Sequence, residues 1–493
     1  MFQFELPERF RRYVPLTVWL LVVLVLLLIP LKIISYGYLP ADDALRHCAK
    51  AVSGKSWPEI LVVGSTYKID QSLGWHAVLG FVHQLTGWGA EGLVVFSVVA
   101  LFLLVNGALL PWLKRPEAWL VALLSAMIVS DLPQRYLLGR PFDVTMAVLM
   151  IILLVTQQAR PDRKYFALFM GLIAICTYVH GVWYLWLLPV MAFLFAGEFG
   201  WGLLLAGAWI SGTAISALVS GHPVNYLSHA LMMALHGVGG HLTNRTEVTE
   251  LQPFGGDILA VVIVGALVGL RLTARLPLSS LVRSPTFWLM CGCWILAFRI
   301  SRFWEDWGWP ALMVLITVDM QTLFQARFPA DSLRRLLLAA ILGLAAFFAV
   351  TSDLNSRYTK NLTWEFLSTA EHPELQGWMP DKGGVLYTAE MGIFYETFFK
   401  NPKGDWRYIL GYEPALMPKD DFKTYRSILW NRGDAKAYEP WVEKMKPADR
   451  LVIRGTKGER PNIPQLEWDY GVTGIWIGRL PRTNAPATPG STD

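Results

Sequence analysis

Two adjacent aspartates, Asp42 and Asp43, lie in the segment YGYLPADDALRHC, directly after the first long apolar stretch of the chain. Ionised carboxylates near a membrane surface can accept a proton or hold a cation, and neighbouring carboxylates raise each other's pKa. The pair is therefore a candidate catalytic site or a candidate site for a cation. The alternative is structural, because acidic residues that follow a proline are typical of the first turn of a helix.

A third aspartate, Asp143, opens an apolar stretch in the segment LLGRPFDVTMAVLMIILLV. A charged group that faces lipid at the bilayer centre costs about 2.5–3.5 kcal/mol, so acids in such stretches usually have a function or a partner. Arg140 precedes Asp143 by three residues, and Arg135 lies on the same predicted loop. These three residues are candidate substrate-binding groups; a structural ion pair or a helix cap is the alternative.

Four charged residues, Arg299, Arg302, Glu305 and Asp306, lie in the segment FRISRFWEDWGWPALMVL. Arginines three residues apart share one face of a helix, and two guanidinium groups can bind a phosphate through paired hydrogen bonds. The segment therefore predicts a phosphate-binding site. The two acids could equally neutralise the arginines in a structural network.

A histidine, His180, interrupts the apolar segment ICTYVHGVWYLWLLPV and is followed by Gly181. The pair predicts a break between two short helices. An ionisable residue inside a membrane segment is a candidate for a functional site, so we include His180 among the substrate-binding candidates. A buried histidine with a structural hydrogen bond is the alternative.

The elements that position these residues follow from the composition. Of the 493 residues, 54% are hydrophobic and only 16% are charged, and the apolar residues form long stretches with almost no charge. A soluble chain could not bury so much apolar surface, so the sequence predicts a polytopic α-helical membrane protein. The chain has no basic patch interleaved with aromatic residues, and we expect no nucleic-acid partner.

The apolar stretches predict about eleven membrane-spanning helices, to within a few residues at each end. They lie at residues 16–35, 91–113, 117–130, 142–158, 165–179, 181–196, 201–219, 257–276, 286–298, 308–324 and 333–351. Arg9, Arg11 and Arg12 precede the first stretch, and arginines and lysines are denser in the loops on the same predicted side. Basic loops mark the cytoplasmic side. The N-terminus is therefore predicted to be cytoplasmic, and the loops 36–87 and 220–256 external.

The C-terminal part of the chain differs from the rest. The membrane domain is predicted to cover residues 1–352, and residues 353–482 to form a small soluble α/β domain outside the cytoplasm. Strands are expected in GGVLYT, WRYIL, DRLVIRG and GVTGIWIGRL, and helices in EMGIFYETFFK, KTYRSILW and EPWVEKMK. Residues 483–493 have no apolar pattern and are predicted to be disordered.

Taken in order, these features resemble the integral-membrane C-type (GT-C) glycosyltransferases, in particular the protein O-mannosyltransferase and aminoarabinose-transferase group. The resemblance covers roughly residues 10–350 and rests on five segments in the order that the family shows. They are the acidic pair Asp42-Asp43, the interfacial stretch GWHAVLGFVHQLTG, the element Arg140-Pro-Phe-Asp143, the stretch GLIAICTYVHGVWYLWLLP and the segment from Arg299 to Pro310. The chain departs from the family pattern in three places. Asp43 replaces the usual Glu, His180 replaces a lysine, and Ser72-Leu-Gly-Trp75 replaces Pro-Pro-Leu-Tyr.

The resemblance implies an enzyme that transfers a sugar from a polyprenyl-phosphate donor to an acceptor outside the cytoplasm, which could be a glycan, a lipid or a protein. Asp42 would be the base that deprotonates the acceptor hydroxyl, and Asp43 would assist it or bind a divalent metal ion. Arg299, Arg302 and Arg140 would hold the lipid phosphate. The resemblance also implies an inverting reaction and a location in a bacterial inner membrane, with the C-terminal domain in the periplasm.

Two other classes of function stay open from the residues alone. A transporter of lipid-linked glycans would use the same arginines without a base, but would be expected to show repeat symmetry between its halves. A non-catalytic envelope or assembly protein would keep the fold and bind partners through residues 353–482.

Overall fold

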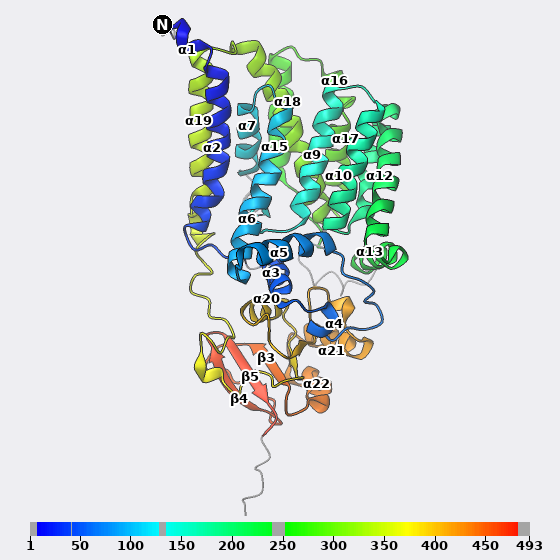
Figure 1. Cartoon of the computed structure of the whole chain (residues 1–493), viewed down its shortest axis with the longest axis vertical. Helices are drawn as coiled ribbons and strands as arrows, with labels where there is room; N and C mark the ends of the chain where they lie inside the picture. The colour runs from blue at the N-terminus through cyan, green and yellow to red at the C-terminus, as the bar shows by residue number, and fades with distance from the viewer. Residues whose placement is uncertain (1–6, 41, 128–134, 239–251, 482–493) are drawn as a thin grey trace, which may run out of the picture. The chain divides into compact units, whose positions relative to one another are not determined.

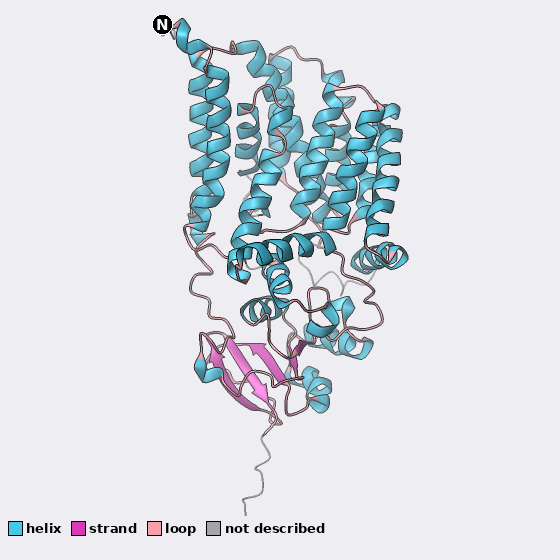
Figure 2. Ribbon diagram, viewed as in Figure 1, coloured by secondary structure: helices cyan, strands magenta, loops and turns pink. Residues whose placement is uncertain are grey.

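The computed structural model describes residues 7–40, 42–127, 135–238 and 252–481. The segment predicted to be disordered, residues 483–493, lies outside the described residues. The chain forms two compact units. The helical unit comprises Met1–Pro40, Ile69–Val78 and Gly92–Leu362, and the mixed unit comprises Ala41–Lys68, Leu79–Glu91 and Thr363–Asp493. Figures 1 and 2 show their helices and strands.

The helical unit consists of α-helices joined by short loops (Figure 2). Its helices are α1 (Glu8–Arg11), α2 (Val14–Ile34), α6 (Ala90–Gly107), α7 (Glu117–Met127), α9 (Phe142–Gln158), α10 (Arg163–Val179), α11 (Leu187–Phe195), α12 (Phe199–Val219), α13 (Pro223–Val238), α15 (Ile258–Thr273), α16 (Leu278–Val282), α17 (Pro285–Ala297), α18 (Trp309–Arg327) and α19 (Leu333–Thr351). One further helix, α5 (Leu73–Thr86), belongs in part to each unit and covers most of the predicted interfacial stretch.

The pairing of α2 with α19 shows how these apolar helices pack (Figure 1). One face of α2, with Val18, Val22 and Leu26, is buried, whereas Leu20 and Leu24 on the other face are exposed. The facing side of α19 is lined by small residues (Ala339, Gly343 and Ala346), and a side chain at Gly343 would press on α2. Small residues allow two helices to approach closely, which is how helices associate in lipid.

Among the residues that the structure describes, four helices are long and apolar enough to cross a membrane. They are Val14–Ile34, Ala90–Trp112, Phe199–Val219 and Leu333–Thr351, and five further apolar helices have only 10–17 residues. The long apolar helices identify an integral membrane protein. The predicted number of about eleven spans is not confirmed, because several predicted spans form helices shorter than the roughly 20 residues that a straight span needs.

The mixed unit is built on one five-stranded sheet with the strand order β2-β1-β3-β5-β4. The strands are β1 (Val385–Tyr387), β2 (Arg407–Tyr408), β3 (Arg450–Arg454), β4 (Glu467–Val472) and β5 (Ile475–Arg479). The first three strands are parallel, and β3, β5 and β4 pair in antiparallel fashion. The helices are α3 (Asp43–Ser53), α4 (Trp57–Ile60), α20 (Met391–Lys400), α21 (Lys419–Trp430) and α22 (Glu439–Lys444).

Each predicted strand and helix of the C-terminal part forms where it was expected, but β4 was not predicted. It forms a hairpin with β5 through a turn that contains Gly474 at a φ of 83°. Helix α3 comes from the segment after the first apolar helix and packs on α20. The mixed unit therefore joins the acidic pair to residues more than 300 positions later in the chain.

Candidate functional site

Asp42 begins helix α3 as its N-cap residue. Its backbone is extended, with φ −153°, and its side-chain Oδ1 accepts a hydrogen bond from the backbone N–H of Asp43 at 2.6 Å. An aspartate at this position satisfies one of the backbone donors that the first turn of a helix leaves without a partner. The structural interpretation of the acidic pair as a helix start is thus confirmed, and it is compatible with a chemical role for the same carboxylate.

Asp43 accepts hydrogen bonds from two side chains of the mixed unit. Its Oδ1 lies 2.8 Å from Nε of Arg46, three residues later on the same helix, and 3.0 Å from the hydroxyl oxygen of Tyr395 on α20. The Asp43 side chain keeps 25% of its surface exposed. Its carboxylate is therefore held in place by one cation and one neutral donor, on a partly open surface next to Asp42.

Arg46 is itself held by aromatic rings. Its guanidinium group lies 4.3 Å from the centre of the Tyr412 ring, and Tyr412 packs against Trp57 at 4.7 Å between ring centres. A cation over an aromatic face is attracted by the negative charge density of the ring. The rings fix the direction of the guanidinium group, and the guanidinium group in turn fixes Asp43.

The protonation states of these donors follow from their surroundings. Burial and the nearby Asp43 carboxylate both raise the pKa of Tyr395 well above its ordinary value. Burial opposes the charge of Arg46, but Asp43, Tyr395 and Tyr412 outweigh it, and the pKa of Arg46 is raised. At neutral pH, Tyr395 therefore keeps its proton and Arg46 its charge, and both donate to Asp43.

The acidic pair does not fit a metal ion that is held by protein ligands alone. Among the described residues, no three His, Cys, Asp or Glu side chains gather in a way that could hold a metal ion. One oxygen of Asp43 already accepts from an arginine and a tyrosine, which compete with a cation for that oxygen.

In the helical unit, Asp306 is the centre of a second network. Arg135 donates from Nε to Oδ1 of Asp306 at 2.8 Å and forms an ion pair with Glu305 at 2.7 Å, and Arg302 approaches the other oxygen of Asp306 at 3.3 Å. The side chain of Asp306 is only 3% exposed, whereas that of Arg302 is 35% exposed. Two arginines and two carboxylates neutralise each other here, which is the structural alternative that the sequence left open.

The two acids of this network lie on a short π-helix, residues Trp304–Gly308, which precedes α18. A side chain at Gly308 would collide with the ring of Trp304, so the wide turn requires glycine at this position. Short π-helical segments are often found at functional sites.

The predicted pairing of Arg299 with Arg302 on one helical face is wrong. Helix α17 ends at Ala297, and residues 298–301 form a turn, so the two arginines do not share a helix. Arg299 is exposed. The basic residue that joins Arg302 in the network is Arg135, which precedes it by more than 160 positions.

The remaining candidates, Arg140, Asp143 and His180, lie around one aromatic residue. Phe142, next to Asp143 in the first turn of α9, contacts the ring of His180 at 5.2 Å between centres and the ring of Trp307 at 6.2 Å. Arg140 accepts a hydrogen bond at its carbonyl from the N–H of Asp143 at 3.0 Å. The structure thus joins the start of α9, His180 and the π-helical segment within the helical unit.

Asp143 and His180 both lie at helix ends, where the sequence predicted that one helix begins and another breaks. Asp143 is buried at the start of α9, and its Oδ2 has no hydrogen-bond partner among the described residues. His180 is the C-cap of α10 and separates it from the short helix Trp183–Trp186, so the predicted break is confirmed. A buried carboxylate oxygen that lacks a partner is uncommon and calls for a ligand, a water molecule or an ion.

Sequence reasoning did not find three residues of the site, namely Arg46, Tyr395 and Tyr412. Arg46 could have been found, because its spacing of three residues from Asp43 on a predicted helix indicates an ion pair. Tyr395 and Tyr412 carried no such signal, since only the fold brings them to the acidic pair.

Comparison with known proteins identifies the fold. No protein-family model matches the chain, and no curated protein matches it in sequence. Among solved structures, the cryo-EM structure of the arabinofuranosyltransferase AftD from Mycobacteria matches it with a TM-score of 0.50 and 13% sequence identity. The match covers 95% of this chain but 40% of the AftD chain, so this chain spans less than half the length of that protein.

At this level of identity the likeness shows the fold and no more. The predicted fold, that of a membrane glycosyltransferase, is confirmed at this coarse level. The narrower resemblance to the O-mannosyltransferase and aminoarabinose-transferase group stays a prediction. The chain is thus an integral membrane protein that shares its fold with a glycosyltransferase.

Proposed function

We propose that the chain is a glycosyltransferase that moves a sugar from a polyprenyl-phosphate donor to a hydroxyl of an acceptor outside the cytoplasm. The observation that carries this proposal is the likeness of fold to an arabinofuranosyltransferase over 95% of the chain. The acidic pair supports it, because it places two carboxylates directly after the first apolar helix, on a helix start that fixes both of them.

In this reaction Asp42 is the general base. The acceptor hydroxyl gives its proton to the Asp42 carboxylate while its oxygen forms a bond to the anomeric carbon of the donor sugar. The bond from that carbon to the phosphate oxygen breaks on the opposite face, and its electron pair leaves with the phosphate. The anomeric configuration is therefore inverted. A general base of this kind contributes roughly 10²–10⁴-fold to the rate.

The structure suggests different roles for the two aspartates. The hydrogen bonds from Arg46 and Tyr395 hold one oxygen of Asp43 in a fixed position. Asp43 therefore acts as a fixed negative charge that positions the base or the acceptor. Asp42, at the start of the helix, is the proton acceptor of the pair.

The phosphate of the donor is proposed to bind to arginines of the helical unit. Arg135 binds both Glu305 and Asp306 and its side chain is 11% exposed, whereas the side chain of Arg302 is 35% exposed. We assign Arg302 to the phosphate, with Arg299 and Arg140 as further donors. Charge-assisted hydrogen bonds of this type stabilise the negative charge that develops on a leaving phosphate. Asp143 and His180 stay proposed substrate contacts.

The proposal includes a location. The chain would lie in a bacterial inner membrane with a cytoplasmic N-terminus, and the acceptor would reach it from the periplasm. It would bind the lipid bilayer and a polyprenyl-phosphate sugar as its partners.

The experiment that tests this function follows the release of polyprenyl phosphate. The purified chain is mixed with a panel of polyprenyl-phosphate sugars, each with and without extracts that contain candidate acceptors. Release that requires both one particular donor and an acceptor supports the transferase. If the folded protein releases no polyprenyl phosphate from any donor but binds the lipid-linked sugars, the proposal fails and a transporter or an assembly protein takes its place.

A further inference from the structure

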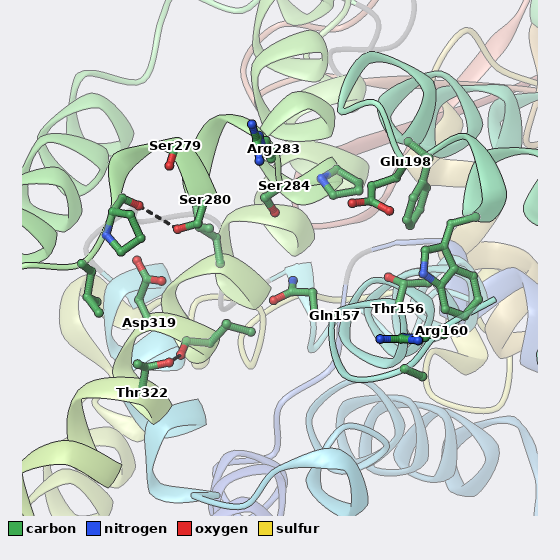
Figure 3. Close-up of a pocket in the computed structure, with 18 of the residues that line it drawn as sticks. Thr156, Gln157, Arg160, Glu198, Ser279, Ser280, Arg283, Ser284, Asp319 and Thr322 are labelled. Atoms are coloured by element: carbon green, nitrogen blue, oxygen red, sulfur yellow. Dashed lines mark hydrogen bonds between the residues drawn. The ribbon is translucent and has the colours of Figure 1, made fainter.

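A polar cleft opens at the end of the helical unit where α9 finishes and α17 begins (Figure 3). Its volume is about 610 Å³, and it lies among the ends of α9, α15, α17 and α18. Asp319, which lines this cleft, follows Asp306 by 13 residues along the π-helix and α18. This spacing corresponds to roughly 20 Å of helix. The cleft is therefore separate from the charge network around Asp306.

Two polar contacts fix the walls of the cleft. Arg271 on α15 binds Asp319 on α18 through two hydrogen bonds of 2.6 Å, and both side chains are nearly buried. Gln157 at the end of α9 donates to the hydroxyl of Thr286 in the first turn of α17 at 3.1 Å. The cleft is thus formed before any ligand binds, which lowers the entropy cost of binding.

The remaining charged side chains of the lining are two arginines and one glutamate. Asp319 neutralises Arg271, but Arg160 and Arg283 make no ion pair with any described residue, and Glu198 is the one other acid in the lining. The cleft therefore carries a net positive charge. Figure 3 shows Arg160, Arg283 and Glu198 around it.

Hydroxyl donors lie near Arg283, whereas Arg160 lies in another part of the same lining (Figure 3). Ser284 is the N-cap of the 13-residue helix α17, yet its side chain makes no capping hydrogen bond. Its hydroxyl and that of Ser279 both line the cleft. Two unpaired guanidinium groups with hydroxyls at the positive end of a helix are the donor set that binds phosphate in proteins.

The surface next to the cleft is apolar. Phe195 and Phe199 flank the lining residue Glu198 and are 65% and 63% exposed, and Val282, next to Arg283, is 51% exposed. A ligand that fits both surfaces has a phosphate and an acyl chain. Basic pockets at the ends of membrane helices bind lipid headgroups in this way.

We propose that this cleft binds the phosphate headgroup of an anionic membrane lipid, in the leaflet on the same side as the N-terminus. This site is independent of the proposed transfer reaction. The apolar surface favours a lipid over free phosphate, because free phosphate would gain nothing from Phe195 or Phe199.

The test compares three ligands on the detergent-purified full-length chain at fixed ionic strength. They are a short-chain phosphatidylglycerol, a short-chain phosphatidylcholine and inorganic phosphate, and the measurement is a binding isotherm for each. The test variant is Arg160→Ala with Arg283→Ala. The matched control is Arg327→Ala with Arg334→Ala, which removes the same charge from exposed positions that do not line the cleft.

We expect the test variant to bind phosphatidylglycerol about tenfold more weakly than the wild type, since two charge-assisted hydrogen bonds are lost. The control should bind as the wild type does, and phosphatidylcholine should bind more weakly than phosphatidylglycerol to both of these proteins. An equal loss in the control would show diffuse surface charge and would overturn the proposal. So would inorganic phosphate that binds as tightly as phosphatidylglycerol, because the ligand would then be the free anion.

The four substituted side chains are exposed, so we expect both variants to fold. Elution of each variant at the wild-type volume on size exclusion checks this.

Discussion

Asp43 and Asp306 are both carboxylates held by arginine, but their surroundings differ. Asp43 has one arginine and one tyrosine as donors and stays partly exposed, whereas Asp306 has two arginines and is almost completely buried. A buried ion pair that loses one partner leaves an uncompensated charge, and a partly exposed one can be solvated instead. The comparison therefore assigns Asp306 mainly to the stability of the helical unit and Asp43 to the positioning of the acidic pair.

The largest expected effect comes from breaking the buried network. Asp306→Ala leaves Arg135, whose side chain is only 11% exposed, with Glu305 as its remaining acid in the network, and we expect a loss of about 3–5 kcal/mol. Glu305→Ala removes an acid that is 31% exposed and should cost about 1 kcal/mol or less. Thermal unfolding of the two variants in one detergent checks this order. Equal losses would show that Asp306 has no special role in the network.

A smaller effect is expected at the partly exposed Asp43. Tyr395→Phe removes the hydroxyl that donates to Asp43 but keeps the ring, so the loss of stability should be about 1–2 kcal/mol. Tyr438→Phe, a buried tyrosine of the same unit, is the control and should change stability by less than that. Thermal unfolding is again the measurement. If Tyr395→Phe lowers the rate of sugar transfer no more than Tyr438→Phe does, Tyr395 has no part in positioning Asp43.

The smallest effect concerns pH. Burial raises the pKa of Glu396, which lies in α20 beside Tyr395 and binds Arg454 at 2.9 Å. A carboxyl group whose folded pKa is raised contributes stability below its ordinary value of 4.5, and this contribution is lost as the pH rises through the folded pKa.

The melting temperature of the wild type should therefore fall over this window more steeply than that of Glu396→Gln. Glu467→Gln, which removes a half-exposed carboxyl group of the same unit, serves as the control. The slope of melting temperature against pH is the quantity to compare. A slope that Glu396→Gln leaves unchanged would assign the pH dependence to other groups.

The sequence predicted those features that depend on local signals. Asp42 was recognised as a possible helix start, and His180 with Gly181 as a break, because caps and helix breakers act within a few residues. The apolar helix after Arg12 and the strands β3 and β5 were expected from apolar patterns alone. These features formed where the local pattern placed them.

The features that the sequence did not predict depend on distant parts of the chain. Tyr395 reaches Asp43 only because α20 packs on α3, and no spacing along the chain indicates this contact. The turn after α17 separated Arg299 from Arg302, and a helical spacing rule cannot foresee a turn that forms next to a π-helix. Strand β4 is an exception, because its residues from Glu467 to Val472 alternate between polar or small and apolar types. This local pattern could have predicted the strand without its pairing with β5.

The central claim is that Asp42 accepts the proton of the acceptor, and Asp42→Asn tests it most directly. Asparagine caps a helix as well as aspartate does, so the variant should fold and melt as the wild type does. Asparagine cannot take up a proton, and we expect transfer with the best donor and acceptor to slow by about 10²–10⁴-fold. Transfer at the wild-type rate by a folded Asp42→Asn protein would contradict the proposed mechanism.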